Sequence, residues 1–514
     1  MDESTFFGRL RLQRNPFQFT NADEEDNLPD YFVQPPYFDP AWGEPETPSP
    51  CVVFGLRGAG KSALRRMMEL RSREKDVFAI QYSRFEFDAG QSLKNIDLNY
   101  HLRNLITLSL VGLLMTIYDR NLNHLSFSAA EQQEMKQLVG LYLGRIQPDQ
   151  LKSATKAIMT PLGRAQAFLR ERLWIVDAVV SAIMSKVGLS SGQVPVQDAS
   201  IEPASKNHLE AVVNLLCELG YTAVYVLVDK VDETSVTGND SKASFDLIAP
   251  MLRDLELLQM KKVGFKFFLW NEIGPYYRRY ARPDRVEQFN ISWKTEELKE
   301  MMRRRLTAHA VHRELTFFDL FDPSMGIAIK ESVELLVFAF SHGSPRDMIR
   351  ICQHMTSEQL RFDPTATGIG LKGVTDGLDS YCNQRAEEVV PPGILSELRK
   401  THRLDFTVNY VANDVFKISQ NGARSKIKTW MDAGVVKHVD DVKTDKPARP
   451  VHHFAVTDSR VAKVIFKELN FLDFLSQKLV LCRDCNQELL RDWDLSNQHI
   501  CHRCGKRFSY RPPS

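Results

Sequence analysis

The sequence predicts an α/β protein built on a parallel sheet, with helical additions and two small modules near its C-terminal end. Three observations lead to this expectation. Short, continuously apolar runs, such as residues 51–54 and 223–228, have the composition of strands that are buried on both faces. They alternate with segments in which apolar residues recur every three or four positions, as in helices. A chain of 514 residues is also too long to fold around a single hydrophobic core, so two to four domains are expected.

The composition narrows the class of protein. Hydrophobic residues make up 43% and charged residues 25%, which is typical of a folded globular chain. The net charge is +1, so a nucleic-acid surface would have to be a local patch. The opening residues are acidic and contain no long apolar run, so we expect no secretory signal. The most apolar stretch, residues 105–118, is shorter than the ~20 residues of a membrane span, which favours a buried core helix and no membrane partner.

Cysteine usage gives no sign of a disulfide framework. Four of the eight cysteines are scattered singles, and the other four form a tight set near the C-terminus. Together with the absence of an export signal, this favours a reducing cytoplasm as the location of the protein.

The first half of the chain divides into a leading segment and a predicted core domain. Residues 1–50 are rich in proline and aromatic residues and are expected to wrap the first domain. The core is expected over residues 51–294, with a helical insertion at about 100–200. Its predicted strands, in order, are residues 51–54, 77–87, 223–228, 262–270 and 286–293, with helices over 62–74, 208–220 and 241–258.

A helical region follows the core. Thr295 and the glutamates after it fit the N-terminal cap of a charged helix, and the pattern from about 330 to 388 is also helical. We therefore expect a helical lid over residues 295–390.

A glycine-rich turn lies directly between the first predicted strand and the helix after it. Its residues, GLRGAGKS, match the pattern G-x-x-x-x-G-K-[ST] of the P-loop. Glycine allows backbone N–H groups to approach a phosphate closely, and the start of a helix adds a positive dipole end. The predicted nucleotide-binding residues are Gly55, Arg57, Gly58, Ala59, Gly60, Lys61, Ser62 and Ala63, with Lys61 on the terminal phosphates and Ser62 on Mg²⁺.

Acidic residues follow the apolar strand 223–228, in the sequence VLVDKVDE. Asp229 is placed to hold the water shell of Mg²⁺, as the aspartate of a Walker B element does. Asp232 and Glu233 are both candidates for orienting the attacking water, and the sequence does not choose between them.

The order of these motifs resembles AAA+ ATPases of the origin-recognition and initiator type. The resemblance covers about residues 15–470 and implies ATP binding and hydrolysis, nucleotide-dependent homo-oligomers and a DNA-binding winged helix after the lid. It also implies roles for single residues. Asn271, at the end of KFFLWN, is similar to the sensor-1 residue, and Arg346, in GSPRDM, is similar to the sensor-2 arginine. Arg282 or Arg285 stands where an arginine finger reaches a neighbouring subunit.

The sequence departs from that family in two places. Lys230 occupies the position after the Walker B aspartate where the family usually has its catalytic glutamate. Either Asp232 or Glu233 replaces it, or hydrolysis is slow and the protein is an ATP-gated switch. The long insertion before residue 208 is the second departure. A basic residue after the aspartate also resembles bacterial P-loop proteins of signalling or phage-defence systems.

Residues 391–470 have the pattern of a winged helix. Residues 406–419 and 423–436 are predicted helices, and residues 450–458 a strand that follows a basic loop. Residues 399–463 contain 13 Lys and Arg against 7 Asp and Glu, a local charge of +6. We therefore expect DNA binding, with Arg424, Lys426 and Lys428 near the start of the second helix; protein binding by the same module is the alternative.

The last segment, residues 478–510, has the cysteine spacing of a zinc ribbon. Two C-x₂-C pairs are separated by fifteen residues, which suits a closed, tetrahedral and structural Zn²⁺ site. The predicted ligands are Cys482, Cys485, Cys501 and Cys504, and His499 and His502 are close enough to substitute. The metal is expected to supply folding energy to so small a module, whose target is DNA, a partner protein or the chain's own ATPase domain.

Three functions are therefore compared. The first is a DNA-binding AAA+-like ATPase, with ATP, Mg²⁺ and Zn²⁺ as cofactors. The second is a signalling P-loop NTPase of an antiviral defence system, whose C-terminal modules bind a protein effector. The third, a metabolic kinase, is disfavoured because nothing in the sequence resembles a site for an acceptor substrate.

Overall fold

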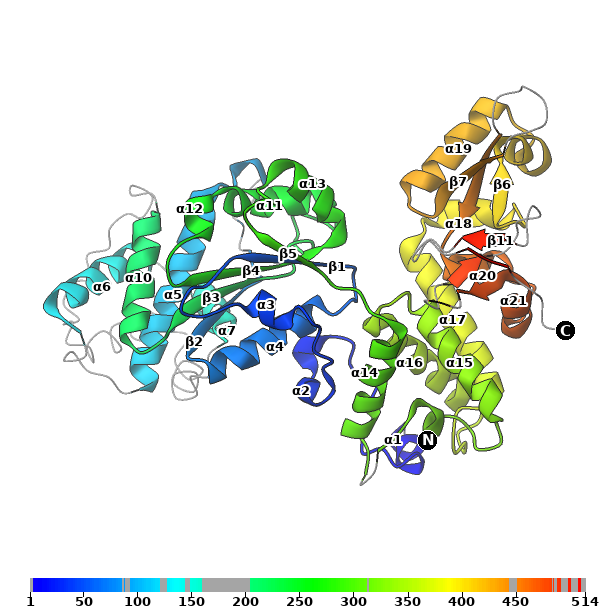
Figure 1. The fold of residues 1–514 in the computed structure, drawn as a ribbon, viewed down its shortest axis with the longest axis horizontal. Helices are drawn as coiled ribbons and strands as arrows, with labels where there is room; N and C mark the ends of the chain where they lie inside the picture. Colours follow the sequence, from blue (N-terminus) through cyan, green and yellow to red (C-terminus); the bar gives the residue numbers. More distant parts are fainter. Residues whose placement is uncertain are drawn as a thin grey trace. The chain divides into compact units, whose positions relative to one another are not determined.

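The computed structural model divides into two compact units, each with its own hydrophobic core (Figure 1). The sheet unit is Gln34–Ser292, and the helical unit combines Met1–Val33 with Trp293–Ser514. The structure describes residues 3–85, 87, 93–120, 127–143, 148–159, 204–311, 314–442, 451–482, 484, 488–490, 498–500 and 507–509.

The sheet unit is built on a parallel sheet whose five described strands have the order β2-β3-β4-β1-β5. β1, β3 and β4 consist almost entirely of buried residues, as continuous apolar runs predict. The strands are β1 (Cys51–Gly55), β2 (Val77–Tyr82), β3 (Ala223–Val228), β4 (Val263–Trp270) and β5 (Glu287–Asn290). Each observed strand lies within the range predicted for it, except that β1 extends one residue further, to Gly55. β2 and β5 are shorter than predicted.

Helices cover both faces of this sheet. In Figure 1, α3 (Phe38–Trp42) and α4 (Lys61–Glu74) lie on one side, and α11 (Ser241–Arg253) and α13 (Gly274–Tyr280) lie on the other. The remaining described helices of the unit are α5 (Leu98–Asp119), α6 (Ala129–Tyr142), α7 (Pro148–Ala157), α10 (Lys206–Glu218) and α12 (Leu255–Leu258), with 3₁₀ turns η2 (Leu93–Asn95) and η4 (Asn271–Ile273). Much of the predicted 100–200 insertion lies outside the described residues.

α5 contains the apolar stretch that the sequence assigned to a buried helix. It is the one helix in the described part of the chain with the length and hydropathy of a membrane span, yet 72% of its most apolar window is buried inside the protein. Leu105, Ile106 and Leu110 on this helix have no exposed surface. α5 therefore packs as a core helix, as predicted.

The second segment of the helical unit begins with α14 (Thr295–Ala308), the charged helix predicted after residue 294. It continues with η5 (Phe317–Leu320), α15 (Ile327–Phe340), α16 (Pro345–Phe362), α17 (Leu371–Val389) and α18 (Pro392–Arg399). Two glycines allow α16 and α17 to pack closely. A Cβ at Gly377 would lie 2.4 Å from the Cα of Met355, and one at Gly373 would lie 2.5 Å from the Gln359 side chain.

The N-terminal segment is divided between the two units, whereas the sequence led us to expect that residues 1–50 would wrap the core domain. α1 (Glu3–Arg9), η1 (Ala22–Glu24) and α2 (Leu28–Tyr31) belong to the helical unit, and α3 belongs to the sheet unit. The reason is apolar burial, because Phe6, Phe7 and Phe17 lie in the core of the helical unit with almost no exposed surface.

Arg305 on α14 anchors this N-terminal segment. Its side chain is 4% exposed, forms an ion pair with Glu25 at 2.7 Å and donates to the carbonyl oxygen of Phe19 at 3.0 Å. Its guanidinium also lies over the Tyr31 ring, 4.8 Å from the centroid. Burial raises the pKa of Glu25 although Arg305 opposes this shift.

Arg305→Ala is expected to lower the free energy of unfolding of the helical unit by about 2–3 kcal/mol, because it leaves buried acceptors unpaired. The loss stays in this range because the Glu25 carboxyl, whose pKa is already raised, can neutralise itself by taking up a proton. Urea denaturation of the full chain measures the effect. Arg303→Ala is the matched control, since Arg303 lies on the same helix with its side chain 39% exposed. Equal stability losses in the two variants would contradict the anchoring role.

The C-terminal part of the helical unit contains small antiparallel sheets. β6 (Asp405–Thr407), β8 (Val451–Val456) and β7 (Val436–Val442) form a sheet in the order β6-β8-β7. Between β6 and β7 lie a π-helical segment, Tyr410–Phe416, and α19 (Gln420–Asp432). The predicted helix 406–419 is therefore a strand followed by a short π-helix, because Phe406 turns into the core against Trp430.

The chain then continues through α20 (Ser459–Ile465) and α21 (Phe471–Lys478). Two antiparallel hairpins follow, made of β9 (Leu479–Leu481) with β10 (Glu488–Leu490) and β11 (Gln498–Ile500) with β12 (Arg507–Ser509).

Candidate functional site

The glycine-rich turn joins the end of β1 to the first residue of α4. Gly58 has φ 80° and Gly60 has φ 100°, both in the left-handed region that favours glycine. At Gly55 the constraint is space, because a Cβ would lie 3.1 Å from Cγ of Lys61 and 3.2 Å from Cδ1 of Ile291. Each glycine of the motif thus has a physical reason in this turn.

Lys61 and Ser62 occupy the first two positions of α4. The ammonium of Lys61 curls back over the turn and donates to the carbonyl oxygens of Gly55 at 2.9 Å and Leu56 at 3.0 Å. The first backbone amides of α4 have no partner within the helix and point at the turn. The dipole of this 14-residue helix also has its positive end there. The turn therefore combines backbone donors, one side-chain ammonium and the start of a helix, which is the arrangement that binds phosphate.

Asp229 follows β3 and meets the start of α4. Ser62 Oγ donates to Oδ2 of Asp229 at 3.1 Å, and the buried Arg65 donates its Nε to the same oxygen at 3.0 Å. The sequence predicted Ser62 and Asp229 as neighbours in one site, and the structure brings them together. Arg65 was not predicted.

Asp232 is 6% exposed and is paired with an arginine of the turn itself. Arg57 donates to Oδ2 of Asp232 from Nε at 3.1 Å and from a terminal nitrogen at 2.8 Å. The same arginine donates to Oδ1 of Asn239 at 2.8 Å and lies 4.3 Å from the centre of a ring of Trp270. Arg57 thus connects the turn to the carboxyl ends of β3 and β4.

Glu233 differs from Asp232 in its surroundings. It is exposed, and its carboxylate has no hydrogen bond or ion pair to any described residue. Lys230, which lies between Asp229 and Asp232 in the chain, has φ 58°, a left-handed conformation that is uncommon outside glycine.

Asn271 follows the last residue of β4, next to the turn that follows β1. β4 pairs with β1 on one side and β3 on the other, and the residue before Asn271 pairs with Gly55. The side-chain oxygen of Asn271 is buried and has no hydrogen-bond partner within the described structure. A buried, unpaired acceptor at this edge is uncommon and calls for a functional explanation.

The two finger candidates are exposed in the sheet unit. Arg282 pairs with Asp284 at 3.2 Å, and Arg285 lies 3.6 Å from the same carboxylate with its side chain 59% exposed. Arg346 lies in the helical unit, on the first turn of α16, where it is exposed. The sensor and finger roles of these arginines stay predictions.

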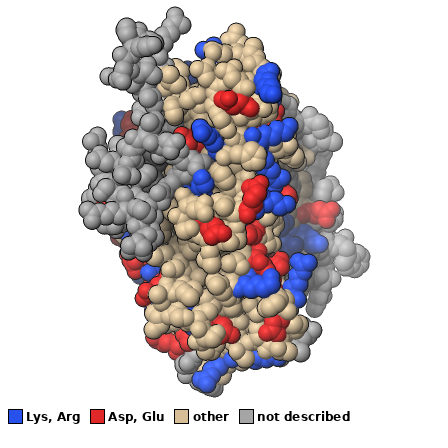
Figure 2. All heavy atoms as spheres, turned by 90° about the vertical axis from the view of Figure 1, so that its right-hand side faces the viewer, with Lys and Arg blue, Asp and Glu red and all other residues tan. Residues whose placement is uncertain are grey.

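Of the three basic residues predicted for DNA, two are exposed. Arg424 and Lys428 lie on the solvent face of α19, whereas Lys426 forms an ion pair with Glu397 on α18 and lies over the Phe416 ring. Figure 2 shows one face of the molecule, on which Lys and Arg are interspersed with Asp and Glu among the residues drawn in colour.

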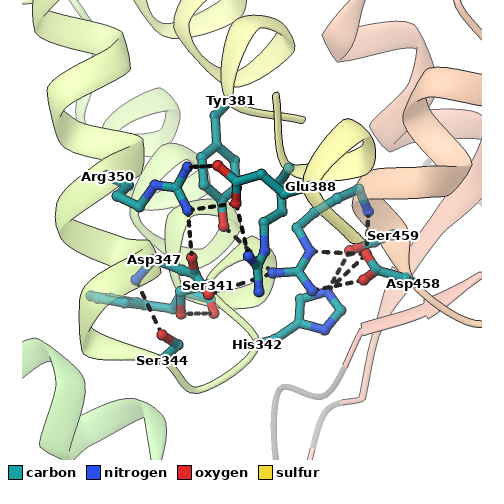
Figure 3. Close-up of polar contacts among 12 residues, drawn as sticks. Ser341, His342, Ser344, Asp347, Arg350, Tyr381, Glu388, Asp458 and Ser459 are labelled. Atoms are coloured by element: carbon teal, nitrogen blue, oxygen red, sulfur yellow. Dashed lines mark hydrogen bonds and ion pairs between the residues drawn. The ribbon is translucent and has the colours of Figure 1, made fainter. Parts of the chain in front are cut away.

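A polar cluster, of which Asp347 and Arg460 are buried, fixes α16 to α17 and α20. Arg460 is 3.6 Å from Asp347 and 2.7 Å from Asp458, and Arg350 pairs with both Asp347 and Glu388. Figure 3 shows Asp347, Arg350 and Glu388 turned toward one another, with the Tyr381 ring beside them. Burial would raise the pKa of Asp458, but His342 and Arg460 hold it far below its usual range. The bond from Arg350, with a smaller effect of Arg385, lowers the pKa of Glu388 to about 2. The cluster ties the helix that carries Arg346 to the segment after β8.

Most of the predicted zinc site lies outside the described residues. Cys482, at the end of β9, is buried, and Cys485, Cys501, Cys504 and His502 are not described. His499 lies on β11, paired with Phe508. Within the described ranges no group of three or more His, Cys, Asp and Glu residues could hold a metal ion.

Arg65 and Trp270 are the site residues that the sequence did not single out. A signal for Arg65 was present, since an arginine four residues before Glu69 can pair with it on a helix. Arg65 also lies beside Leu64 and Met68 in the buried stripe of α4, where a charge needs partners.

Comparisons with known proteins give distant likenesses in fold, found among solved structures. No family model matches the sequence, and a search of curated proteins found no match. Among solved structures, the chain is similar to the Orc1 protein of Aeropyrum pernix, which was solved in complex with DNA. The two share 12% identity over 88% of this chain and 97% of that one, with a TM-score of 0.39. At this distance the likeness carries no function across.

Proposed function

We propose that the sheet unit binds and slowly hydrolyses ATP, and that nucleotide occupancy governs binding of DNA by the helical unit. The observation that carries the proposal is the turn between β1 and α4, with Lys61, Ser62 and Asp229 around it. It lies at the carboxyl ends of parallel strands, where α/β sheets generally bind their ligands.

The donor set around Ser62 fits Mg²⁺. A hydroxyl oxygen and a carboxylate oxygen lie 3.1 Å apart, and Mg²⁺ prefers such hard oxygen ligands while keeping several waters. Ser62 and Asp229 would hold the ion, which would supply charge neutralisation to the phosphates. Asn271, with its unpaired amide oxygen beside Gly55, is the proposed residue that senses the terminal phosphate.

Slow hydrolysis is proposed because the two aspartates near the turn are already paired, and the remaining acid, Glu233, has no partner in the described structure that would hold its carboxylate in place. Asp229 is bonded to Ser62 and Arg65, and Asp232 is bonded to Arg57, so each carboxylate is already engaged with a positive charge that makes it a weaker base. Glu233 is exposed and retains its acceptor capacity, so we assign it the role of orienting the attacking water. Arg285 is proposed as a finger toward a second copy of the chain, and Arg346 as the lid arginine.

DNA binding is proposed for the module made of α18, β6, the π-helical segment, α19 and the β7–β8 hairpin. This order of elements corresponds to the plan of a winged helix, in which the second helix of the pair enters the major groove. Arg424 and Lys428 on the exposed face of α19 are the proposed phosphate contacts, and the zinc ribbon is proposed as a further support. Lys426 is left out of this surface because it holds α18.

Arg424→Ala and Lys428→Ala are each expected to weaken binding of duplex DNA uniformly across sequences. Each removes one phosphate contact, so the slope of log affinity against log salt should fall by about 1. Fluorescence anisotropy over a salt series, with and without a non-hydrolysable ATP analogue, measures both effects. Lys372→Ala on α17 is the matched control. If both variants bound DNA with the slope of the parent protein, DNA binding through α19 would be refuted.

The alternative is a nucleotide-gated switch that binds a protein. The pairing of Lys426 with Glu397 favours it, because this pair removes one of the three basic residues from the exposed face of α19 and a DNA surface is usually strongly basic. Recovery of a stoichiometric protein partner from cells, free of nucleic acid, together with no salt-dependent DNA affinity, would select this alternative.

A further inference from the structure

Arg65 is a charged side chain with no exposed surface, one turn into α4. Its guanidinium is divided between two carboxylates: Nε donates to Asp229 at 3.0 Å, and a terminal nitrogen pairs with Glu69 on the next turn of the same helix. A buried arginine of this kind either stabilises the fold or positions one of its partners for a function.

The Asp229 carboxylate is held on both oxygens. Oδ2 accepts from Ser62 Oγ and from Arg65 Nε, and Oδ1 accepts from the backbone N–H of Lys230 at 2.9 Å. The left-handed conformation of Lys230 accompanies this last bond. The side chain of Asp229 therefore has a single orientation, with Oδ2 facing the hydroxyl proposed to bind Mg²⁺.

We propose that Arg65 is a positioning residue that orients Asp229 for the metal and thereby sets the Mg²⁺ requirement of nucleotide binding. Arg65 does not touch the nucleotide itself. Glu69 holds the other edge of the guanidinium, so Arg65 fixes the end of β3 to the helix that begins with Lys61 and Ser62. Partners that orient a ligand in this way typically change metal affinity 10- to 100-fold when removed. This inference rests on the proposed nucleotide site.

The test uses the full chain and the double variant Arg65→Met with Glu69→Gln. The pair is removed together, so the net charge stays the same and Asp229 loses only its Nε donor. The expected result is that the Mg²⁺ concentration for half-maximal binding of a fluorescent ATP analogue rises about 10- to 100-fold. Binding of the same analogue in EDTA should not change, because the turn and Lys61 are untouched.

Arg65→Lys and Glu69→Gln complete the experiment. Arg65→Lys keeps the positive charge but cannot bridge both carboxylates with a planar fork, so a partial rise in the Mg²⁺ requirement is expected. Glu69→Gln keeps the bond from Arg65 to Asp229, so its Mg²⁺ requirement should stay near that of the parent chain. If thermal melting shows that the double variant does not fold, the Mg²⁺ requirements of the two single variants are compared instead.

Two results would overturn the inference. The first is an unchanged Mg²⁺ requirement in a folded double variant, which would leave Arg65 with a stabilising role only. The second is an equal loss of affinity in EDTA and in Mg²⁺, which would mean that Arg65 supports the turn and not the metal. A parent chain that binds no nucleotide in either condition would instead refute the proposed function.

Discussion

Replacing Lys61 by alanine is expected to reduce nucleotide affinity at least about 100-fold, because charge-assisted hydrogen bonds contribute about 1.5–3 kcal/mol each and the ammonium can donate more than one. The fold should survive, since Lys61 is only partly buried and its present acceptors are two backbone carbonyls of the turn. Isothermal titration with ATP and Mg²⁺ measures the affinity, and thermal melting checks the fold.

Lys75→Ala is the matched control for this experiment. Lys75 follows the last residue of the same helix, is exposed and lies at the opposite end from the turn. We expect parent-like affinity in this variant. Similar affinities for Lys61→Ala and the parent chain would show that the turn is not where the nucleotide binds.

The largest expected loss of stability belongs to Asp229→Ala. Asp229 is 2% exposed and carries the bonds from Ser62, Arg65 and the Lys230 amide. Removing one partner of a buried ion pair typically costs about 3–5 kcal/mol, because the other charge stays buried. Urea denaturation of the sheet unit within the full chain should show this loss, and the Mg²⁺ dependence of nucleotide binding should disappear.

Glu233→Gln provides the comparison for Asp229→Ala. Glu233 is exposed, so its substitution should change stability by no more than about 0.5 kcal/mol. It should lower the rate of ATP hydrolysis while leaving affinity intact. A stability loss in Asp229→Ala as small as that of Glu233→Gln would contradict the buried network.

The parts of the site that depend on residues close together in the chain could be predicted from the sequence. The glycines at 55, 58 and 60 follow from local backbone requirements, and Asp229 follows from its place after an apolar strand. The strands β1, β3 and β4 were predicted closely because their apolar runs are continuous. Their order in the sheet was not predicted, since pairing depends on the tertiary fold.

Contacts between distant residues could not be predicted. Arg57 and Asp232 are 175 positions apart, and Arg65 and Asp229 are 164 apart, so neither pairing is visible in a local pattern. The ion pair between Lys426 and Glu397 could not be predicted either. From the sequence alone, Lys426 was expected to contact DNA together with Arg424 and Lys428. The N-terminal segment was misplaced in part because it contacts a helix far along the chain: Arg305 and Glu25, which form an ion pair, are 280 positions apart.

Calorimetric titration of the full chain with ATP in the presence of Mg²⁺ addresses the central claim most directly. We expect saturable binding of one nucleotide per chain, with a lower affinity when Mg²⁺ is removed. A flat titration, with neither adenine nor guanine nucleotides taken up by the folded protein, would contradict it.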